Sequence, residues 1–451
     1  MSASDTPAVR RRMEQLAAEG IDVVRVTYPD LIGTERARDV LLDHLPSAMT
    51  HGLAFCRAVY HTSPQGDTVS VAGGLDAGLP DICVTPDLDT LAALPWEPGV
   101  ATVLGNVTDP ATGLPAPESP RDLLRAVLDT WAEHGLRPVV GPELEYFLCD
   151  AAPESEQGWR RYSEADGVVY TAGLRADPDN HLLRTLRLLR DFDIGVSSGN
   201  HEYDGAQFEI NLTHGDAAEA ADRAFRFKSA IKELARKEGR LATFMAKPFN
   251  DAGGSGFHLH LSCLDAAGGN AFADPAAPHA LSATARHAVA GVLAHAPALS
   301  ALANPTVNSY KRLGPDTLAP WLIDWGLDNR SAMVRIPPER GAGSRLELRL
   351  GDASANPYLL IAGTLAAALI GILAGDEPPA PLEGYGYDSA RSATLPTSLP
   401  AALDALEADT ALTELLGKDF TASYLAYKRD EVTRFHRHVT DWEFTEYAYH
   451  L

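Results

Sequence analysis

Pro142-Glu143-Leu144-Glu145-Tyr146-Phe147-Leu148 is the stretch that decides the fold of this 451-residue chain. One apolar residue separates its two glutamates, and successive side chains of a β-strand point to opposite faces of the sheet. The stretch therefore predicts a strand with Glu143 and Glu145 on one face and apolar side chains on the other. An antiparallel sheet with one solvated face would show the same alternation.

Three further stretches place polar residues at positions i and i+2 of an apolar, strand-like run. They are Gln207-Phe208-Glu209-Ile210-Asn211-Leu212, which follows Glu202, then Gly254-Ser255-Gly256-Phe257-His258-Leu259-His260-Leu261-Ser262, and Arg345-Leu346-Glu347-Leu348-Arg349-Leu350. A charge directed inward is costly unless it is paired or bound to a metal. If the strands face one cavity, their glutamates and His258 suit Mg²⁺ or Mn²⁺, whereas zinc prefers thiolates or several imidazoles.

Arginines crowd into one region of a chain that is acidic as a whole. The six are Arg312, Arg330, Arg335, Arg340, Arg345 and Arg349. A guanidinium group binds phosphate or carboxylate through two parallel hydrogen bonds. A solvated basic face is the alternative interpretation, but the interleaving with Glu347 favours a site for an anion and a metal together. The glycine-rich 253–256 segment lacks the GK[ST] ending of a P-loop and indicates only a sharp turn.

The composition excludes several classes of function. A formal net charge of −23 disfavours binding to nucleic acid or to an anionic membrane and favours metal ions or protonated amines. The four cysteines are scattered and the N-terminus has no apolar leader, so we expect a cytoplasmic protein with reduced thiols. Residues 358–374 carry no charge and are at the lower limit for spanning a membrane, but we predict a buried helix there.

The pattern along the chain indicates two domains. Alternating runs at 22–28 and 34–41 predict a hairpin in a small β-rich domain, after a short helix over 7–19. Pro and Gly concentrate in 109–119, so we predict one domain over residues 1–110 and another over 111–451. In the second domain, strands alternate with helical patterns at 181–193, 217–238, 278–296, 356–374, 399–416 and 419–437.

These motifs resemble those of class I glutamine synthetases over nearly the whole chain, in the same order and with similar spacing. The likeness extends to Asn304-Pro305-Thr306-Val307-Asn308-Ser309-Tyr310-Lys311-Arg312-Leu313, to Asn329-Arg330-Ser331 with Arg335-Ile336-Pro337, and to Asp352-Ala353-Ser354-Ala355-Asn356-Pro357-Tyr358. The resemblance implies an α+β fold, with a small N-terminal β-grasp-like domain and a large catalytic domain whose curved antiparallel sheet is flanked by helices. It also implies a homododecamer of stacked hexameric rings, with active sites between subunits.

The resemblance further implies a role for each matching residue. Two or three Mg²⁺ or Mn²⁺ ions per site would be held by two ligand sets, Glu145, Glu202 and Glu209 beside glutamate and Glu143, His258 and Glu347 on the ATP phosphates. The nucleotide contacts would be His260, Ser262, Arg335 and Arg345. Glutamate would contact Gly254 and the catalytic arginines Arg312, Arg330 and Arg349, which also face the transferred phosphate.

The reaction implied is ATP-dependent ligation of an amine to the γ-carboxylate of L-glutamate through γ-glutamyl phosphate. The chain departs from the family where two carboxylates normally surround ammonium, because Leu318 and Cys56 fall at those positions, while Tyr170 keeps a third. Gly253 replaces the usual asparagine, and Ala206 the usual glycine.

Because catching and deprotonating ammonium requires nearby carboxylates, we expect a small, ethanolamine-like primary amine as the substrate. The alternatives are a polyamine, with Asp316 or Glu339 for its second cation, and ammonium itself. A non-catalytic structural or sensing relative is a remote alternative. The aromatic tail Trp442–Tyr447 could pack across a ring interface or within the core.

Overall fold

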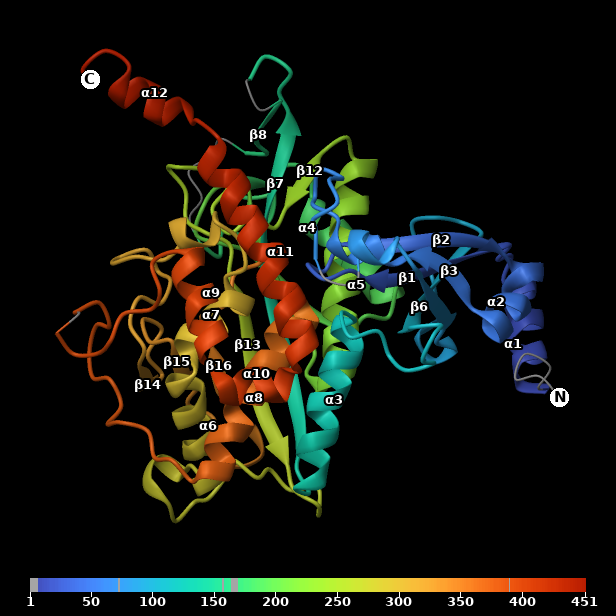
Figure 1. Cartoon of the computed structure of the whole chain (residues 1–451). Coiled ribbons are helices and arrows are strands. Elements are labelled where there is room, and N and C mark those ends of the chain that lie inside the picture. Colours follow the sequence, from blue (N-terminus) through green and yellow to red (C-terminus); the bar gives the residue numbers. More distant parts are fainter. Residues whose placement is uncertain (1–6, 72–73, 156–157, 164–168, 389) are drawn as a thin grey trace.

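Two sheets organise the protein in the computed structural model, which describes residues 7–71, 74–155, 158–163, 169–388 and 390–451 (Figure 1). The first sheet has the order β2-β1-β6-β4-β3, with β5 beside β6, and only its β1–β6 pair is parallel. Its strands are β1 (Val23–Pro29), β2 (Glu35–Leu41), β3 (Leu53–Cys56), β4 (Asp81–Pro86), β5 (Ala92–Ala93) and β6 (Val100–Thr108). Helices α1 (Pro7–Ala18) and α2 (Leu45–His51) accompany them.

The second sheet carries the motifs of the sequence analysis. It has the order β14-β15-β16-β13-β7-β10-β9, with β8, β11 and β12 also paired to the long strand β7. Its strands are β7 (Arg137–Ala151), β8 (Trp159–Arg161), β9 (Val196–His201), β10 (Gln207–Leu212), β11 (Gly215–Asp216), β12 (Leu241–Thr243), β13 (Phe257–Leu264), β14 (Trp325–Leu327), β15 (Val334–Ile336) and β16 (Leu346–Leu348). All pairs except β14–β15 are antiparallel, so the α+β fold expected from the sequence is confirmed.

Helices pack around the second sheet and around one another. They are α3 (Pro120–Glu133), α4 (His181–Asp191), α5 (Ala217–Lys237), α6 (Ala283–Ala294), α7 (Ala296–Ala303), α8 (Pro357–Ala374), α9 (Leu399–Ala408), α10 (Thr410–Leu416), α11 (Lys418–Arg437) and α12 (Asp441–Tyr447). Helix α8 is long and apolar enough to cross a membrane, but most of it is buried against α3, α5, α6, α7 and α10. It is therefore the central helix of the core, as predicted.

Helices α6 and α8 approach each other closely because each presents a glycine to the other. A Cβ atom built on Gly371 would lie 2.3 Å from the carbonyl oxygen of His287, and one built on Gly291 would lie 2.2 Å from that of Ala367. Any side chain at either position would force the two helices apart.

Two of the predicted helices are interrupted. The pattern at 278–296 begins with a single 3-10 turn, and α6 starts only after Ser282, whose hydroxyl caps it at the amide of Ala285. The pattern at 399–416 is divided at Asp409, which caps α10 through the amide of Leu412 and also bonds His295, with 2.5 Å between Oδ2 and Nδ1. Local capping therefore overrode the continuous apolar pattern.

The first sheet is joined to the catalytic part of the chain by buried and half-buried polar contacts. Arg121 on α3 donates to Asp222 on α5, at 2.7 and 2.9 Å, and also to Asp87, at 2.9 Å. Trp96 Nε1 donates to Glu233 at 2.7 Å. These bonds fix how the N-terminal sheet sits on α3 and α5.

The C-terminal segment leaves the body of the protein. Figure 1 shows α12 projecting beyond the end of α11. Thr440 and Glu443 form a reciprocal capping box that starts α12. The side chains of Trp442 and Phe444 are 63% and 71% exposed, so packing of this tail in the core of its own chain is excluded.

Candidate active site

Strand register brings the predicted side chains together on one face of the second sheet. His258 on β13 lies opposite Glu143 on β7, and Glu209 on β10 lies opposite Glu145. His260, two residues along β13, lies opposite Glu347 on β16. Because the side-chain period of a strand is two residues, these pairs form a row across three strand junctions.

The row faces a cavity of about 890 Å³. The expected metal ligands that line it are Glu143, Glu145, Glu202, Glu209, His258 and Glu347. The other predicted residues along its wall are Gly254, His260, Arg312, Arg330, Arg335, Arg345, Arg349, Tyr170 and Leu318. Acidic and basic residues from distant parts of the sequence therefore meet at one site.

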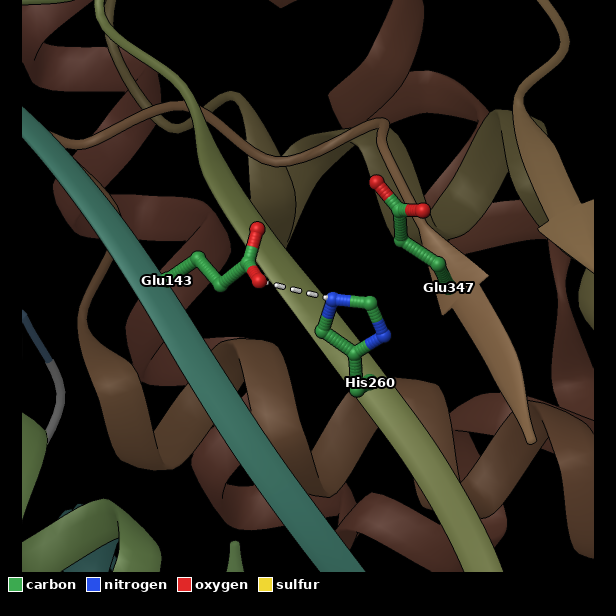
Figure 2. A group of neighbouring side chains, drawn as sticks. All are labelled: Glu143, His260 and Glu347. Atoms are coloured by element: carbon green, nitrogen blue, oxygen red, sulfur yellow. Dashed lines mark hydrogen bonds and ion pairs between the residues drawn. The ribbon is translucent and has the colours of Figure 1, made fainter. Parts of the chain in front are cut away.

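Two groups of side chains offer ligand atoms close enough for a shared cation. One group is Glu143, Glu209 and His258, and the other is Glu143, His260 and Glu347. Within each group the ligand atoms all lie within 4.8 Å of one another. Figure 2 shows Glu143, His260 and Glu347 side by side on β7, β13 and β16. Two carboxylates with one imidazole, as in each group, fit a hard divalent ion.

Burial raises the pKa of three of these carboxylates. Burial and the neighbouring Glu202 raise the pKa of Glu145 to about 7. Burial and the surrounding carboxylates raise the pKa of Glu209 to about 9, and burial also raises the pKa of Glu202. A cation placed among them would remove the repulsion that keeps them protonated.

Glu347 behaves in the opposite way because arginines surround it. Burial alone would raise its pKa, but Arg349 and the neighbouring basic groups lower it to about 2. Arg335 Nη1 donates to Oε2 of Glu347 at 2.5 Å, and Arg349 Nη1 donates to Oε1 at 2.6 Å. Glu347 is thus ionised and also orients two guanidinium groups at the cavity wall.

Of the two histidines, His258 is the one that the site holds in the neutral form that binds metals. Burial and the nearby Arg349 lower the pKa of His258. Arg345 Nε donates to Nδ1 of His260 at 3.2 Å, so His260 carries its proton on Nε2 and donates it to Oε1 of Glu143, at 3.0 Å. His260 therefore orients Glu143 as well as facing the expected nucleotide side.

Residues 316–319 form a flap at the cavity, and the three that line it, Thr317, Leu318 and Ala319, are uncharged. Leu318 is 56% exposed there, between Thr317 and Ala319. Asp316 and Leu318 both have positive φ, at 60° and 62°, which is strained for residues other than glycine. The flap is held from the facing loop, because Tyr385 Oη donates to Asp316 at 3.0 Å and Tyr387 Oη donates to the Ala319 carbonyl at 2.9 Å.

Two predicted residues lie outside the walls of this cavity. Cys56 ends β3 in the N-terminal sheet and is not among the described residues that line the cavity of its own chain. Ser262 lines a neighbouring cavity of about 560 Å³, where its Oγ donates to the Ser344 carbonyl at 2.9 Å. The two cavities share Glu143, His260 and Arg345. Ser262 therefore lies in the cavity next to the one that holds the predicted metal ligands.

Sequence reasoning placed Gln207 on the polar face of its strand but gave no role to it or to several other residues of the cavity. Gln207 donates from Nε2 to Glu145 Oε2 at 3.0 Å and to the Gly254 carbonyl at 3.1 Å, so it orients a predicted metal ligand and the adjacent loop. Its spacing from Glu209 on the same strand face was a usable signal. Tyr203, Asp204, Tyr385 and Tyr387 also line the cavity, but they lie in turns and loops that no periodic pattern marks.

Known proteins match both the sequence and the fold. The family model for the glutamine synthetase catalytic domain matches residues 117–447. The chain is 34% identical to a glutamine synthetase of Methanocaldococcus jannaschii, over 97% of this chain and 98% of that protein. It is 31% identical to a glutamate–isopropylamine ligase of a Pseudomonas species, over 99% of each.

Solved structures agree with these likenesses. A GmaS–ADP complex is similar with a TM-score of 0.85 and 33% identity, over 97% of this chain and 99% of that one. A glutamine synthase homologue is similar with a TM-score of 0.81 and 28% identity, over 94% and 97%. With the carboxylate row and its arginines, these matches show that the chain belongs to the glutamine synthetase family of ATP-dependent, C–N bond-forming ligases.

Proposed function

We propose that this glutamate ligase joins a small, ethanolamine-like primary amine to the γ-carboxylate of L-glutamate, releasing ADP and phosphate. The observation that carries the choice of amine is Leu318, an apolar residue on the flap over the cavity that also holds the glutamates and arginines. One relative is named a glutamate–isopropylamine ligase, after an alkylamine substrate. This name supports a small alkylamine as the substrate class of the present chain.

The proposed reaction has two displacements. An oxygen of the γ-carboxylate attacks the γ-phosphorus of ATP and ADP leaves, which forms γ-glutamyl phosphate. The amine nitrogen then attacks the activated carbonyl carbon, phosphate leaves, and the nitrogen loses a proton. Arg312, Arg330 and Arg349 are proposed to hold the carboxylates and the transferred phosphoryl group, because positioned positive charge supplies most of the catalysis in phosphoryl transfer.

The nucleotide is proposed to occupy the neighbouring cavity and reach the main one past Glu143. Ser262, His260 and Arg345 line that second cavity, and Arg335, bonded to Glu347, lines the main one. Bound divalent ions would neutralise the phosphate oxygens. We propose two or three Mg²⁺ or Mn²⁺ ions, held by the six predicted ligands, because these are five carboxylates and one neutral imidazole.

The uncharged residues of the flap that line the cavity favour a monoamine over the alternatives. An ammonium ion needs carboxylates in contact, and Thr317, Leu318 and Ala319 offer none from their side chains. The two acids considered for the second cation of a polyamine are already engaged, since Tyr385 donates to Asp316 and Arg345 pairs with Glu339 at 3.0 Å. Ammonium and polyamines are therefore the competing substrates in any test.

The assembly is proposed to be a homododecamer with each active site shared between two subunits. Cys56 lies away from the cavity of its own chain, which leaves it free to face the cavity of a neighbouring subunit. The exposed aromatic face of α12 would then be covered by another chain. An apolar surface of this kind on a projecting helix commonly marks a protein–protein contact.

Leu318→Glu should raise the kcat/KM for ammonium about tenfold or more, because it restores a carboxylate beside the amine. The measurement is phosphate release with saturating glutamate and ATP, across ammonium, ethylamine, ethanolamine and putrescine. Leu318→Gln introduces a side chain of nearly the same shape as glutamate but without the charge, and it should not raise the kcat/KM for ammonium. If the wild type uses ammonium with the highest kcat/KM, the proposed choice of amine is wrong.

Mn²⁺ affinity should rise with pH, by up to about tenfold per pH unit for each proton displaced, because metal binding must remove protons from Glu145 and Glu209. Calorimetry in buffers of different ionisation enthalpy would count the released protons. Because the pKa of Glu209 is raised, protein freed of metal by a chelator should lose folding stability as the pH rises from about 5 towards 9. Added metal should restore that stability. A pH-independent affinity would contradict this assignment.

The double variant Trp442→Ala, Phe444→Ala should lower the oligomer below twelve chains, because it removes the apolar face of α12. Light scattering coupled to size exclusion measures the mass directly. Leu114→Ala, which changes an equally exposed leucine in a loop (64%), is the matched control. A dodecamer that persists in the double variant would exclude α12 from the interface.

A further inference from the structure

Asp204 and Gly253 meet at the edge of the main cavity, although 49 residues separate them. Asp204 lies in the turn between β9 and β10, and Gly253 lies in the segment before β13. The amide of Gly253 donates a hydrogen bond to Oδ2 of Asp204. The carboxylate is thereby anchored to the loop that continues into Gly254.

The two residues are also coupled through space. A Cβ atom built on Gly253 would lie 2.5 Å from Oδ2 of Asp204, which is shorter than any contact such an atom could make. The carboxylate of Asp204 therefore occupies the space that a side chain at position 253 would need. Where the family usually has an asparagine amide, this chain has a carboxylate delivered from another loop, so the departure at Gly253 changes the charge of the site.

In the part of the chain that the structure describes, Asp204 has no cationic partner, and unlike Glu145, Glu202 and Glu209, which also form no ion pair, it is not one of the predicted metal ligands. Glu347 pairs with Arg335 and Arg349, and Glu143 bonds His260. Among the ion pairs of the described residues, none includes Asp204. It is also outside the two groups that could share a metal ion, which leaves a cationic group of a substrate as its natural partner.

We propose that Asp204 binds the α-ammonium group of L-glutamate, an inference that rests on the proposed function. Glutamate carries its α-ammonium and α-carboxylate on one carbon, so its site needs a negatively charged acceptor and a positively charged donor close together. Asp204 contacts Gly253, and Arg312 contacts the next residue, since a Cβ on Gly254 would lie 2.5 Å from Arg312 Cγ. A negative and a positive side chain thus lie against adjacent residues of one loop, as the zwitterion requires.

The incoming amine is the competing cation for Asp204, and a substrate analogue separates the two. Glutarate has the two carboxylates of glutamate but lacks the α-ammonium group. Asp204→Asn removes the charge and can still accept the Gly253 hydrogen bond through its amide oxygen, so the loop should keep its position. The experiment is steady-state phosphate release by the full-length protein with saturating ATP, metal and ethylamine, with glutamate or glutarate varied.

Asp204→Asn should raise the KM for glutamate about tenfold or more, as expected for the loss of one charge-assisted hydrogen bond. The KM values for glutarate, ethylamine and ATP should not rise, and the thermal midpoint should stay at the wild-type value. Asp251→Asn removes a carboxylate from the same loop that pairs with Arg161, at 2.9 Å, and is the matched control with unchanged constants.

An unchanged ratio of the glutamate and glutarate KM values in Asp204→Asn would overturn the proposal. A rise confined to the KM for ethylamine would also overturn it, because Asp204 would then bind the amine. Failure of the proposed function would look different, since the wild type itself would then release no phosphate in response to glutamate and an alkylamine.

Discussion

Mutual repulsion among buried carboxylates is the constraint on which the rest of this structure depends. Glu145, Glu202 and Glu209 share one cavity, and their raised pKa values record how costly their ionisation is without a cation. Glu347, held among arginines, shows the other solution, in which basic side chains keep a buried carboxylate charged. The site therefore combines positions that call for a metal with positions already neutralised by the protein, which is what chemistry on a phosphate requires.

The spacing and register of the strands fix the distances between these charged side chains. Neighbouring strands lie about 5 Å apart, so residues paired in register, such as Glu143 with His258, are within reach of one shared ion. A shift of one residue would turn the whole row away from the cavity. The helices α3 and α5 pack on β7, and both also pack on the buried helix α8 at the centre of the helical layer.

The alternation of Glu143, Glu145, His258 and Glu347 with apolar residues was sufficient to predict the strands and their polar face, because a period of two residues is local information. The resemblance to glutamine synthetases then predicted the arginines that line the cavity. The breaks at Ser282 and Asp409 were missed because capping bonds competed with a continuous apolar pattern. Asp204 and Tyr385 were missed because their roles depend on where loops distant in sequence meet, as at Gly253 and Asp316.

The central claim is that the cavity activates glutamate by transferring phosphate from ATP to its γ-carboxylate. The most direct measurement uses glutamate labelled with ¹⁸O in the γ-carboxylate, with ATP and an alkylamine, and determines the isotope content of the released phosphate by mass spectrometry. Passage through γ-glutamyl phosphate predicts that each phosphate released carries one oxygen from glutamate. Phosphate without label would mean that water attacks ATP, and it would contradict this account of the site.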